Sequence, residues 1–139
     1  MAYLVDEEGN PINSNNPLPI QDQGKYLDLG AVITATNMAA GATAFSGWND
    51  NVAWVRNITL LSQSDQQHDI GVTRRDAGTA TSGIGTALVT NQPSTASDWR
   101  SNSIAPPNAI LGYSARFYLK NSSASPNTVG NLRVQLMGV

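Results

Sequence analysis

The chain has no cysteine, one histidine and only two glutamates among its 139 residues. The absence of cysteine excludes a disulfide framework, thiol catalysis and sulfur-ligated zinc. A zinc site would therefore need carboxylates beside His68, and no such cluster stands at ligand spacing. We expect neither a metal site nor a cofactor.

Charged residues are also scarce. They make up 13% of the chain, about half of the usual quarter, and leave a net charge of −2. In their place the chain has 13 Ser, 11 Thr, 14 Asn and 7 Gln. The scattered basic residues give no footprint for nucleic acid, so we expect no such partner. A neutral, amide-rich surface favours contact between subunits, because few ions lose water when two faces meet.

Long apolar runs are missing as well. No segment approaches the roughly 18 apolar residues of a membrane span, and the N-terminus lacks the basic-then-apolar layout of a signal peptide. We expect a soluble protein that is made in a cytoplasm and has no membrane partner.

The chain begins with a polar segment that prolines interrupt. Proline fixes φ and drives the preceding residue towards extended geometry, so Pro11, Pro17 and Pro19 exclude a continuous helix. About twenty residues at roughly 3.1 Å each reach on the order of 60 Å, beyond the edge of a compact domain. We therefore predict an extended N-terminal arm, residues 1–24, before a single β-sandwich domain, residues 25–139.

Beyond the arm the apolar residues recur at a period near two, and clusters of Gly, Asn, Pro and Ser separate the runs. This pattern is typical of short strands. The predicted strands are residues 29–36, 52–62, 67–74, 84–90, 113–120 and 132–136, with a short strand after a turn at residues 39–44. Seven or eight strands at intervals of about ten residues favour an all-β, antiparallel β-sandwich with jelly-roll connectivity.

Three details of this sandwich follow from the pattern. Apolar residues on both faces of residues 52–62, including Trp54, predict a central strand and a core tryptophan. Turn chemistry at residues 121–127 predicts that the strands on either side of it pair as a hairpin. Residues 91–108 are too long for a hairpin and are expected to cross between sheets or to project as a contact loop.

His68 raises the question of catalysis. A Ser-His-Asp triad is formally possible from Ser62 or Ser64, His68 and an aspartate, but no nucleophile elbow is present. A surface imidazole that is hydrogen-bonded to its neighbours is the favoured interpretation, and we expect no enzyme. Residues 48–51, Trp-Asn-Asp-Asn, offer oxygen ligands but lack the spacing of a calcium loop, which favours an Asx-type turn.

Two further tryptophans stand in segments that resemble loops. Aromatic faces pack against sugar rings, so Trp48 and Trp99, with Arg100, are candidates for loop contacts or for stacking on a glycan. Packing beneath loops or at a subunit interface is the favoured interpretation.

The opening segment, AYLVDEEGNPINSNNPLPI at residues 2–20, resembles the arm that precedes a β-sandwich in small virion proteins of tailed bacteriophages. The body is similar to these proteins in AAGATAF at residues 39–45 and in ARFYLKN at residues 115–121 before LRVQL at residues 132–136. The resemblance brings no catalytic residues. It implies location in a virion that is assembled in the cytoplasm of a bacterial host, as a capsid decoration, head fibre or tail part.

We therefore expect a capsid decoration or stabilising protein, a homo-oligomer with a trimer assumed, that binds other virion proteins such as the major capsid protein. The arm contacts are expected from Pro11, Ile12, Pro17, Leu18, Pro19 and Ile20. The alternative is a tail, neck or fibre module that binds a host-surface carbohydrate. A hydrolase is disfavoured, because histidine, cysteine and glutamate are so few.

Overall fold

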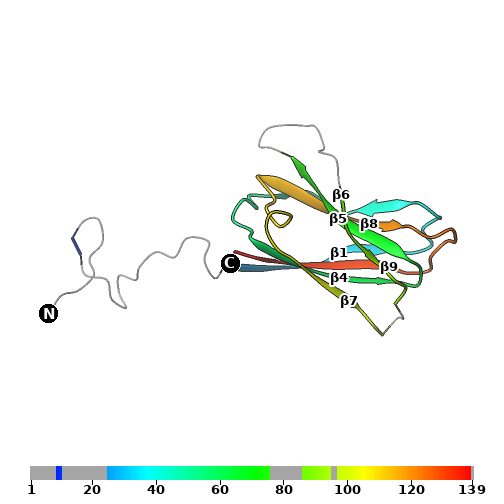
Figure 1. The fold of residues 1–139 in the computed structure, drawn as a ribbon. Coiled ribbons are helices and arrows are strands. Elements are labelled where there is room, and N and C mark those ends of the chain that lie inside the picture. The colour runs from blue at the N-terminus through cyan, green and yellow to red at the C-terminus, as the bar shows by residue number, and fades with distance from the viewer. Residues whose placement is uncertain (1–8, 11–24, 76–85, 95–96, 139) are drawn as a thin grey trace.

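The computed structural model describes residues 9–10, 25–75, 86–94 and 97–138. Within these ranges every element of regular secondary structure is a β-strand (Figure 1). Apart from residues 9–10, the predicted arm lies outside the described residues, and so do the residues that we expect to make its contacts.

The strands lie largely where the period-two pattern predicts them. Along the chain they are β1 (Tyr26–Ala35), β2 (Thr43–Phe45), β3 (Asn49–Asp50), β4 (Asn57–Ser64), β5 (His68–Arg75), β6 (Thr86–Asn91), β7 (Arg100–Ile104), β8 (Ser114–Asn121) and β9 (Gly130–Met137). The short strand β2 follows the turn that the sequence predicts before it, whereas β3 and β7 were not predicted.

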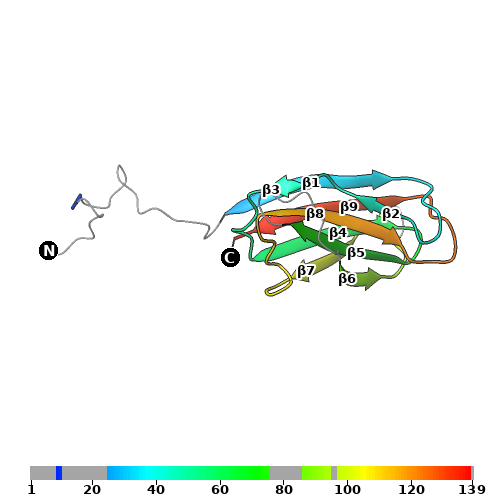
Figure 2. The ribbon, with the colours of Figure 1, turned by 90° about the horizontal axis from the view of Figure 1, so that it is seen from above.

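Two antiparallel sheets pack face to face in two layers (Figure 1), and their strands run in similar directions (Figure 2). The β4 sheet has the order β1-β9-β4-β7, and the β8 sheet has the order β2-β8-β5-β6, with β3 paired to another part of β8. The pairings are nested: β1 with β9, β2 and β3 with β8, β4 with β7, and β5 with β6. This is jelly-roll connectivity, so the predicted antiparallel β-sandwich is confirmed.

The core lies between the sheets and is built from alternate residues of each strand. Leu132, Val134 and Leu136 of β9 are fully buried, and so are Phe117 and Leu119 of β8. Burying one such side chain contributes roughly 1.5–3 kcal/mol. The inner strands of the two sheets therefore supply much of the cohesion of the sandwich.

The predicted hairpin between residues 113–120 and 132–136 is wrong. β8 pairs with β5 and β2 in one sheet, whereas β9 pairs with β1 and β4 in the other. The two strands lie in opposite sheets because the apolar inner face of each covers the other across the core. Asn127 helps to hold the crossing, since its Oδ1 accepts a hydrogen bond from Met38 N at 2.8 Å.

The strand predicted at residues 52–62 begins later than expected, at Asn57. Val55 N donates to the carbonyl of Val52 at 3.1 Å, so this first part is a turn. Trp54 lies in that turn and is only 8% exposed, which confirms its core position but not its place on a strand. The predicted central position is confirmed, because β4 lies between β9 and β7.

The segment at residues 91–108 crosses between the sheets, as predicted, from β6 to β7. Strand β7 itself has the sequence RSNSI, in which only one residue is a large apolar one. It carries no clear apolar stripe because it forms the edge of its sheet, where most of its side chains are exposed or half-buried. The sequence pattern therefore did not reveal it.

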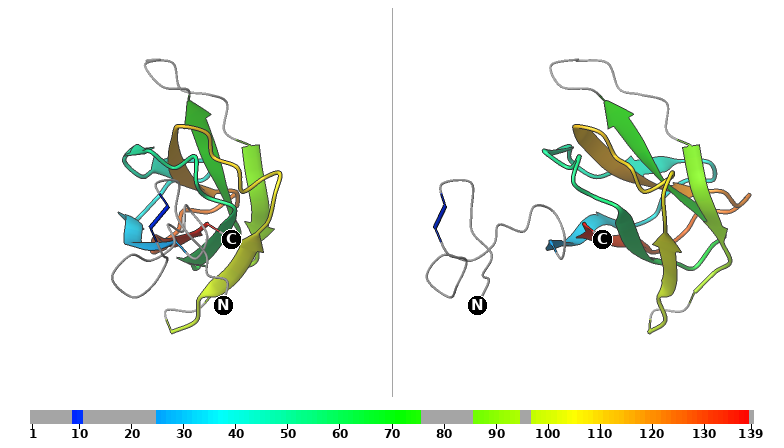
Figure 3. Two further views of the ribbon diagram at one scale, coloured as in Figure 1. Left: turned by 90° about the vertical axis from the view of Figure 1, so that its left-hand side faces the viewer. Right: turned by 60° about the vertical axis from the view of Figure 1, so that its left-hand side comes forward.

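The two ends of the sandwich are distinct. Strand β1 begins and β9 ends at the same end, because Tyr26 and Met137 are register partners. We call this the arm end, since residues 1–24 join the chain there; Figure 3, left, views the sandwich from this side. The connections after β1, β4, β6 and β8 lie at the opposite end, which we call the loop end.

Candidate functional site

Exposed apolar side chains are concentrated at the arm end. Tyr26 is 55% exposed, and its register partner Met137 is 40% exposed. Leu27 follows on β1, and the exposed Ile110 and Tyr113 lie in the connection between β7 and β8 at the same end. Large apolar side chains that gather in one region make it a candidate interaction surface.

The outer face of the β8 sheet carries two arginines stacked on aromatic rings. We call Phe45, Trp48, Arg75 and Arg116 the arginine ladder. The Cζ atom of Arg116 lies 4.1 Å from the ring centroid of Phe45 and 4.9 Å from that of Trp48. The Cζ atom of Arg75 lies 4.1 Å from the centroid of Trp48. Such cation–π contacts are worth roughly 0.5–1 kcal/mol at exposed sites and more when desolvated.

The ladder forms because outward positions of neighbouring strands come into register. Alternation along β8 turns Arg116 and Tyr118 away from the core. Phe45 on β2 is the partner of Tyr118, and their ring centroids are 6.1 Å apart. Arg75 ends β5 opposite Ser114, at the start of β8. The ladder therefore begins next to the arm end.

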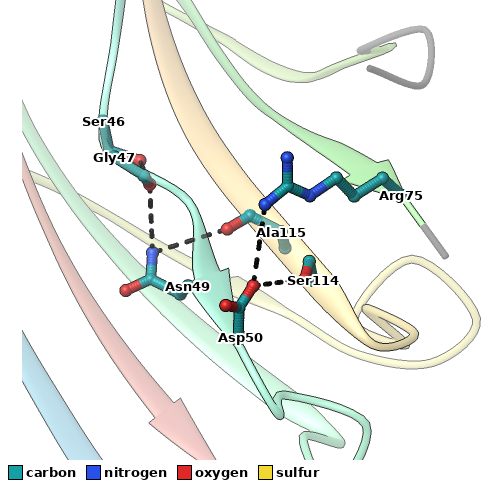
Figure 4. A network of polar contacts seen from close by, with 7 residues as sticks. All are labelled: Ser46, Gly47, Asn49, Asp50, Arg75, Ser114 and Ala115. Carbon is teal, nitrogen blue, oxygen red and sulfur yellow. Dashed lines mark hydrogen bonds and ion pairs between the residues drawn. The ribbon is translucent and has the colours of Figure 1, made fainter. Parts of the chain in front are cut away.

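Polar contacts fix the loop that carries Trp48 (Figure 4). Asp50 accepts a hydrogen bond from Ser114 Oγ at 2.5 Å, and its Oδ1 lies 3.7 Å from Nη2 of Arg75. Asn49 adds two longer contacts, of 3.3 and 3.5 Å, from its Nδ2 to backbone carbonyls. Because both residues that follow the tryptophan are held, its ring stays against the arginines.

Arg116, like Arg75, is half-buried. Its Nε is buried and has no hydrogen-bond partner among the described residues. Stacking restricts the plane of the guanidinium, and a planar guanidinium binds a carboxylate through two parallel N–H···O bonds. The ladder is suited for this reason to a carboxylate-bearing ligand. In the neighbouring Tyr118, burial raises the pKa of the hydroxyl, and the charge of Asp69 raises it further.

The single histidine is buried at the loop end, so the predicted surface position of His68 is wrong. Its Nδ1 donates to the carbonyl of Gln66 at 2.9 Å, which leaves Nε2 to accept from Ser62 Oγ at 2.9 Å. Asn91 donates from Nδ2 to Ser62 Oγ and to Asn102 Oδ1, each at 2.9 Å. These residues come from both sheets, so the hydrogen bonds join the two layers.

This arrangement does not have the geometry of a catalytic triad. Ser62 and His68 are fully buried, and a backbone carbonyl holds the imidazole nitrogen that an aspartate would hold. The adjacent Asp69 instead accepts a hydrogen bond from Thr90. Burial lowers the pKa of His68, and the charge of Arg100 lowers it further. The imidazole is therefore a neutral link between the sheets.

A buried asparagine, Asn121, joins the connections after β1 and β8. Its Nδ2 donates to the carbonyls of Met38 at 3.1 Å, Ala39 at 3.3 Å and Ser125 at 2.8 Å. Its Oδ1 accepts from the backbone N of Ser123 at 3.2 Å and from the hydroxyl at 2.8 Å. The loop end is thus held by internal hydrogen bonds.

Asp65 fastens the connection after β4 to the connection after β8. Its carboxylate accepts from the backbone N atoms of Thr128 at 2.8 Å and Val129 at 3.1 Å, and from Thr128 Oγ1 at 2.9 Å. Burial raises the pKa of Asp65, but these hydrogen bonds outweigh it and hold the pKa below its usual value.

The structure places Trp48 and Trp99 apart. Trp48 precedes β3 on the outer β2–β3 edge of the β8 sheet, whereas Trp99 precedes β7 on the opposite edge of the sandwich. Trp99 is 39% exposed, while two guanidinium groups lie against the ring of Trp48. The guanidinium of Arg100 donates to the carbonyls of Pro93 at 2.6 Å and Gln92 at 3.4 Å, which fixes its connection.

The segment considered for calcium, residues 48–51, lies in a turn at the β3 edge. Asn51 has a φ of 59°, in the left-handed region that asparagine adopts in turns. In the part of the chain that the structure describes, no group of three or more His, Cys, Asp or Glu side chains could hold a metal ion. The same residues contain no helix long and apolar enough to cross a membrane.

Three members of the ladder, Phe45, Arg75 and Arg116, were not singled out by the sequence. The alternation of residues 113–120 predicts the outward direction of Arg116, and this direction is the only local signal. Its aromatic neighbours come from other strands, so their contacts depend on strand order and register.

No family model matches the chain, and no curated protein matches it. Among solved structures, a glycoside hydrolase family 43 arabinoxylan arabinofuranohydrolase from Bacillus subtilis, in complex with cellotetraose, is 16% identical with a TM-score of 0.49, over 96% of this chain and 32% of that chain.

Two structures of infectious bursal disease virus are also similar. The Gx strain structure is 17% identical with a TM-score of 0.46, over 93% of this chain and 38% of that chain. The Gt strain structure is 14% identical with a TM-score of 0.46, over 99% of this chain and 42% of that chain. The chain thus spans between 32% and 42% of the chains that it matches, and at these identities the likenesses assign no function.

Proposed function

We propose that the chain is a virion structural protein of a tailed bacteriophage, a capsid decoration or stabilising protein that binds the assembled shell. The observation that carries this proposal is the exposure of Tyr26, Leu27 and Met137 where the arm joins the sandwich. The arm and the exposed end form one attachment region. Its arm contacts are Pro11, Ile12, Pro17, Leu18, Pro19 and Ile20.

The polar groups of the described residues support a structural role over an enzymatic one. Ser62, His68, Asp65 and Asn121 are all engaged in internal hydrogen bonds between sheets or connections. We propose no enzyme activity for the chain, because the groups that chemistry would use hold the fold together.

The proposed partner is the major capsid protein. We propose that this chain forms a homo-oligomer, taken to be a trimer, and that the oligomer contacts the major capsid protein in the virion. Only 13% of the residues are charged, so few ions lose water at such contacts. A standard interface buries about 1,600 Å² in total, and repetition over a shell lets modest contacts hold by multivalency.

Deletion of residues 1–20 tests the arm. We expect the shortened protein to keep its β-sheet circular dichroism spectrum. When it is added to capsid shells prepared without this protein, it should no longer co-sediment with them. A full-length control with Ile12→Ser, Leu18→Ser and Ile20→Ser should show most of the same loss, because it removes apolar contacts without shortening the chain. Normal occupancy after the deletion would contradict the arm's role.

Electron microscopy of intact particles tests the position in the virion. We expect density for the protein on the shell. Density on the tail alone would contradict a decoration role and favour the alternative function below.

The exposure of Trp99 favours a second candidate, a carbohydrate-binding module of a tail or fibre. In this case, binding on a glycan array should be lost in Trp99→Ala. Trp48→Ala should keep it, because guanidinium groups already lie against that ring. Loss in both variants, or no binding by the unmodified protein, would contradict this alternative.

A further inference from the structure

The chain separates its charges between the arm and the body. Residues 1–24 contain four of the ten acids, an acidic run at residues 6–8 (Asp-Glu-Glu) and Asp22, and neither lysine nor arginine. All 8 basic residues therefore lie in residues 25–139 with the remaining six acids, which gives this part a net charge of +2 although the whole chain has −2. The arm and the body are electrostatically complementary.

Most arginines of the body already have partners. Arg56, Arg74 and Arg100 each donate to backbone carbonyls. Arg75 lies between the carboxylate of Asp50 and the ring of Trp48. In Arg116, by contrast, stacked on two rings, Nε is buried without a hydrogen-bond partner among the described residues. Because this Nε is covered, a carboxylate from another molecule would bind the Nη edge of the Arg116 guanidinium.

We propose that the acidic run of one copy binds the arginine ladder of a second copy. A carboxylate of the run accepts hydrogen bonds from the edge of the Arg116 guanidinium, which stacking holds in plane, and Arg75 supplies a second positive charge. The apolar residues 3–5 (Tyr-Leu-Val), which directly precede the run, pack on the exposed ring of Phe45. This contact rests on the proposed homo-oligomer.

The reach of the arm favours a second copy over the arm's own sandwich. With three prolines, the stretch from the acidic run to Lys25 is expected to be extended, and it then spans on the order of 50 Å. A strand of eight residues, such as β8, is only about 27 Å long. An extended arm of this length is able to bring the run to a second copy, beyond the sandwich to which it belongs.

Charge exchange in the full-length protein tests the contact, with self-association measured by sedimentation equilibrium at low salt. Glu7→Lys with Glu8→Lys, or Arg116→Glu alone, should each weaken self-association at least about tenfold. Combining them should restore it to within about threefold of the unmodified protein, because the charges are again opposite. Asp22→Lys with Arg133→Glu, on the arm and on the other sheet, is the matched control and should have little effect.

A second measurement separates contact between copies from contact within one chain. The chain has no cysteine, so Glu7→Cys in one copy and Lys120→Cys, on the ladder's face, in a differently tagged copy can be joined by a bismaleimide. We expect a cross-linked pair of the two copies. Arg116→Gln, which keeps the aliphatic stem, should reduce the yield without changing the melting temperature by more than a few degrees.

Three results would overturn the proposal. The first is a monomer at all concentrations, and the second is charge exchange that fails to restore association. The third is a cross-link that forms only when Glu7→Cys and Lys120→Cys are placed in the same chain. Co-sedimentation with shells is measured separately. If the charge variants self-associate as strongly as the unmodified protein and still bind shells, the ladder contact is wrong and the proposed function stands. If the deletion of residues 1–20 leaves shell binding intact, the proposed function fails whatever the ladder does.

Discussion

At the loop end polar side chains are buried and hydrogen-bonded, whereas at the arm end apolar side chains are exposed. Asn121 and His68 are fully buried and satisfied within the chain. Tyr26 and Met137 stand side by side in solvent. A buried polar group needs its partner in place, whereas an exposed apolar group gains when another surface covers it. The loop end is therefore held largely by its own hydrogen bonds, and the arm end is where we propose an interface.

The largest expected effect is at the loop end, in Asn121→Ala. This change removes the three hydrogen bonds that the buried Nδ2 donates to backbone carbonyls and the two that Oδ1 accepts from Ser123, so we expect the free energy of unfolding to fall by about 2–4 kcal/mol in denaturant titrations. Asn131→Ala is the matched control. Its Nδ2 donates to Gln63 Oε1 at 3.0 Å and its buried Oδ1 has no hydrogen-bond partner among the described residues, so we expect a loss below about 1 kcal/mol. Equal losses would show that the loop end does not depend on Asn121.

The next effect depends on pH. The pKa of His68 is lowered in the folded state from 6.5, so as pH falls below 6.5 the unfolded chain binds a proton that the folded chain does not. Stability should therefore be complete above pH 6.5 and decline from there down to the folded-state pKa. Asp65, whose pKa is lowered from 3.8, contributes stability that is lost only at more acidic pH.

Denaturant titrations between pH 8 and pH 5 measure this effect. His68→Gln should lower the free energy of unfolding by about 1–3 kcal/mol at pH 8, because the link between the sheets is lost. In the same variant the free energy of unfolding should also fall less steeply between pH 8 and pH 5 than in the unmodified protein. An unchanged slope in this variant would show that another group causes the decline.

The smallest effect on stability is expected at the arm end. Tyr26→Asn with Met137→Gln should change the free energy of unfolding by less than about 0.5 kcal/mol per substitution, because both side chains are exposed. The same double variant should weaken binding to shells. Arg133→Gln, an exposed position on β9, is the control and should change neither property. A large loss of stability would show that the arm end is part of the core.

The fold was predictable where the pattern is local. The alternation in residues 132–136 and 113–120 identifies two strands and their inner faces correctly. Their pairing was predicted wrongly, because the turn residues between them also suit a crossing from one sheet to the other. Strand β7 was missed because an edge strand needs no apolar stripe.

The candidate site was predictable only in part, for a related reason. Trp48 was a candidate from its position in a loop, but Phe45 and Arg116 meet it from other strands. His68 was expected at the surface because its neighbours in sequence are polar. Its partner Ser62 comes from the facing sheet, and that contact allows the imidazole to be buried.

The sequence by itself determined the class of the fold, the polar arm with its prolines, and the absence of cysteine chemistry, since composition and alternation are properties of the chain read locally. Only the tertiary structure decided that β8 and β9 lie in opposite sheets, that the guanidinium of Arg116 lies against two aromatic rings, and that exposed apolar residues gather where the arm joins the sandwich. These facts join residues far apart in the chain, and the packing of two sheets around one core brings such residues together.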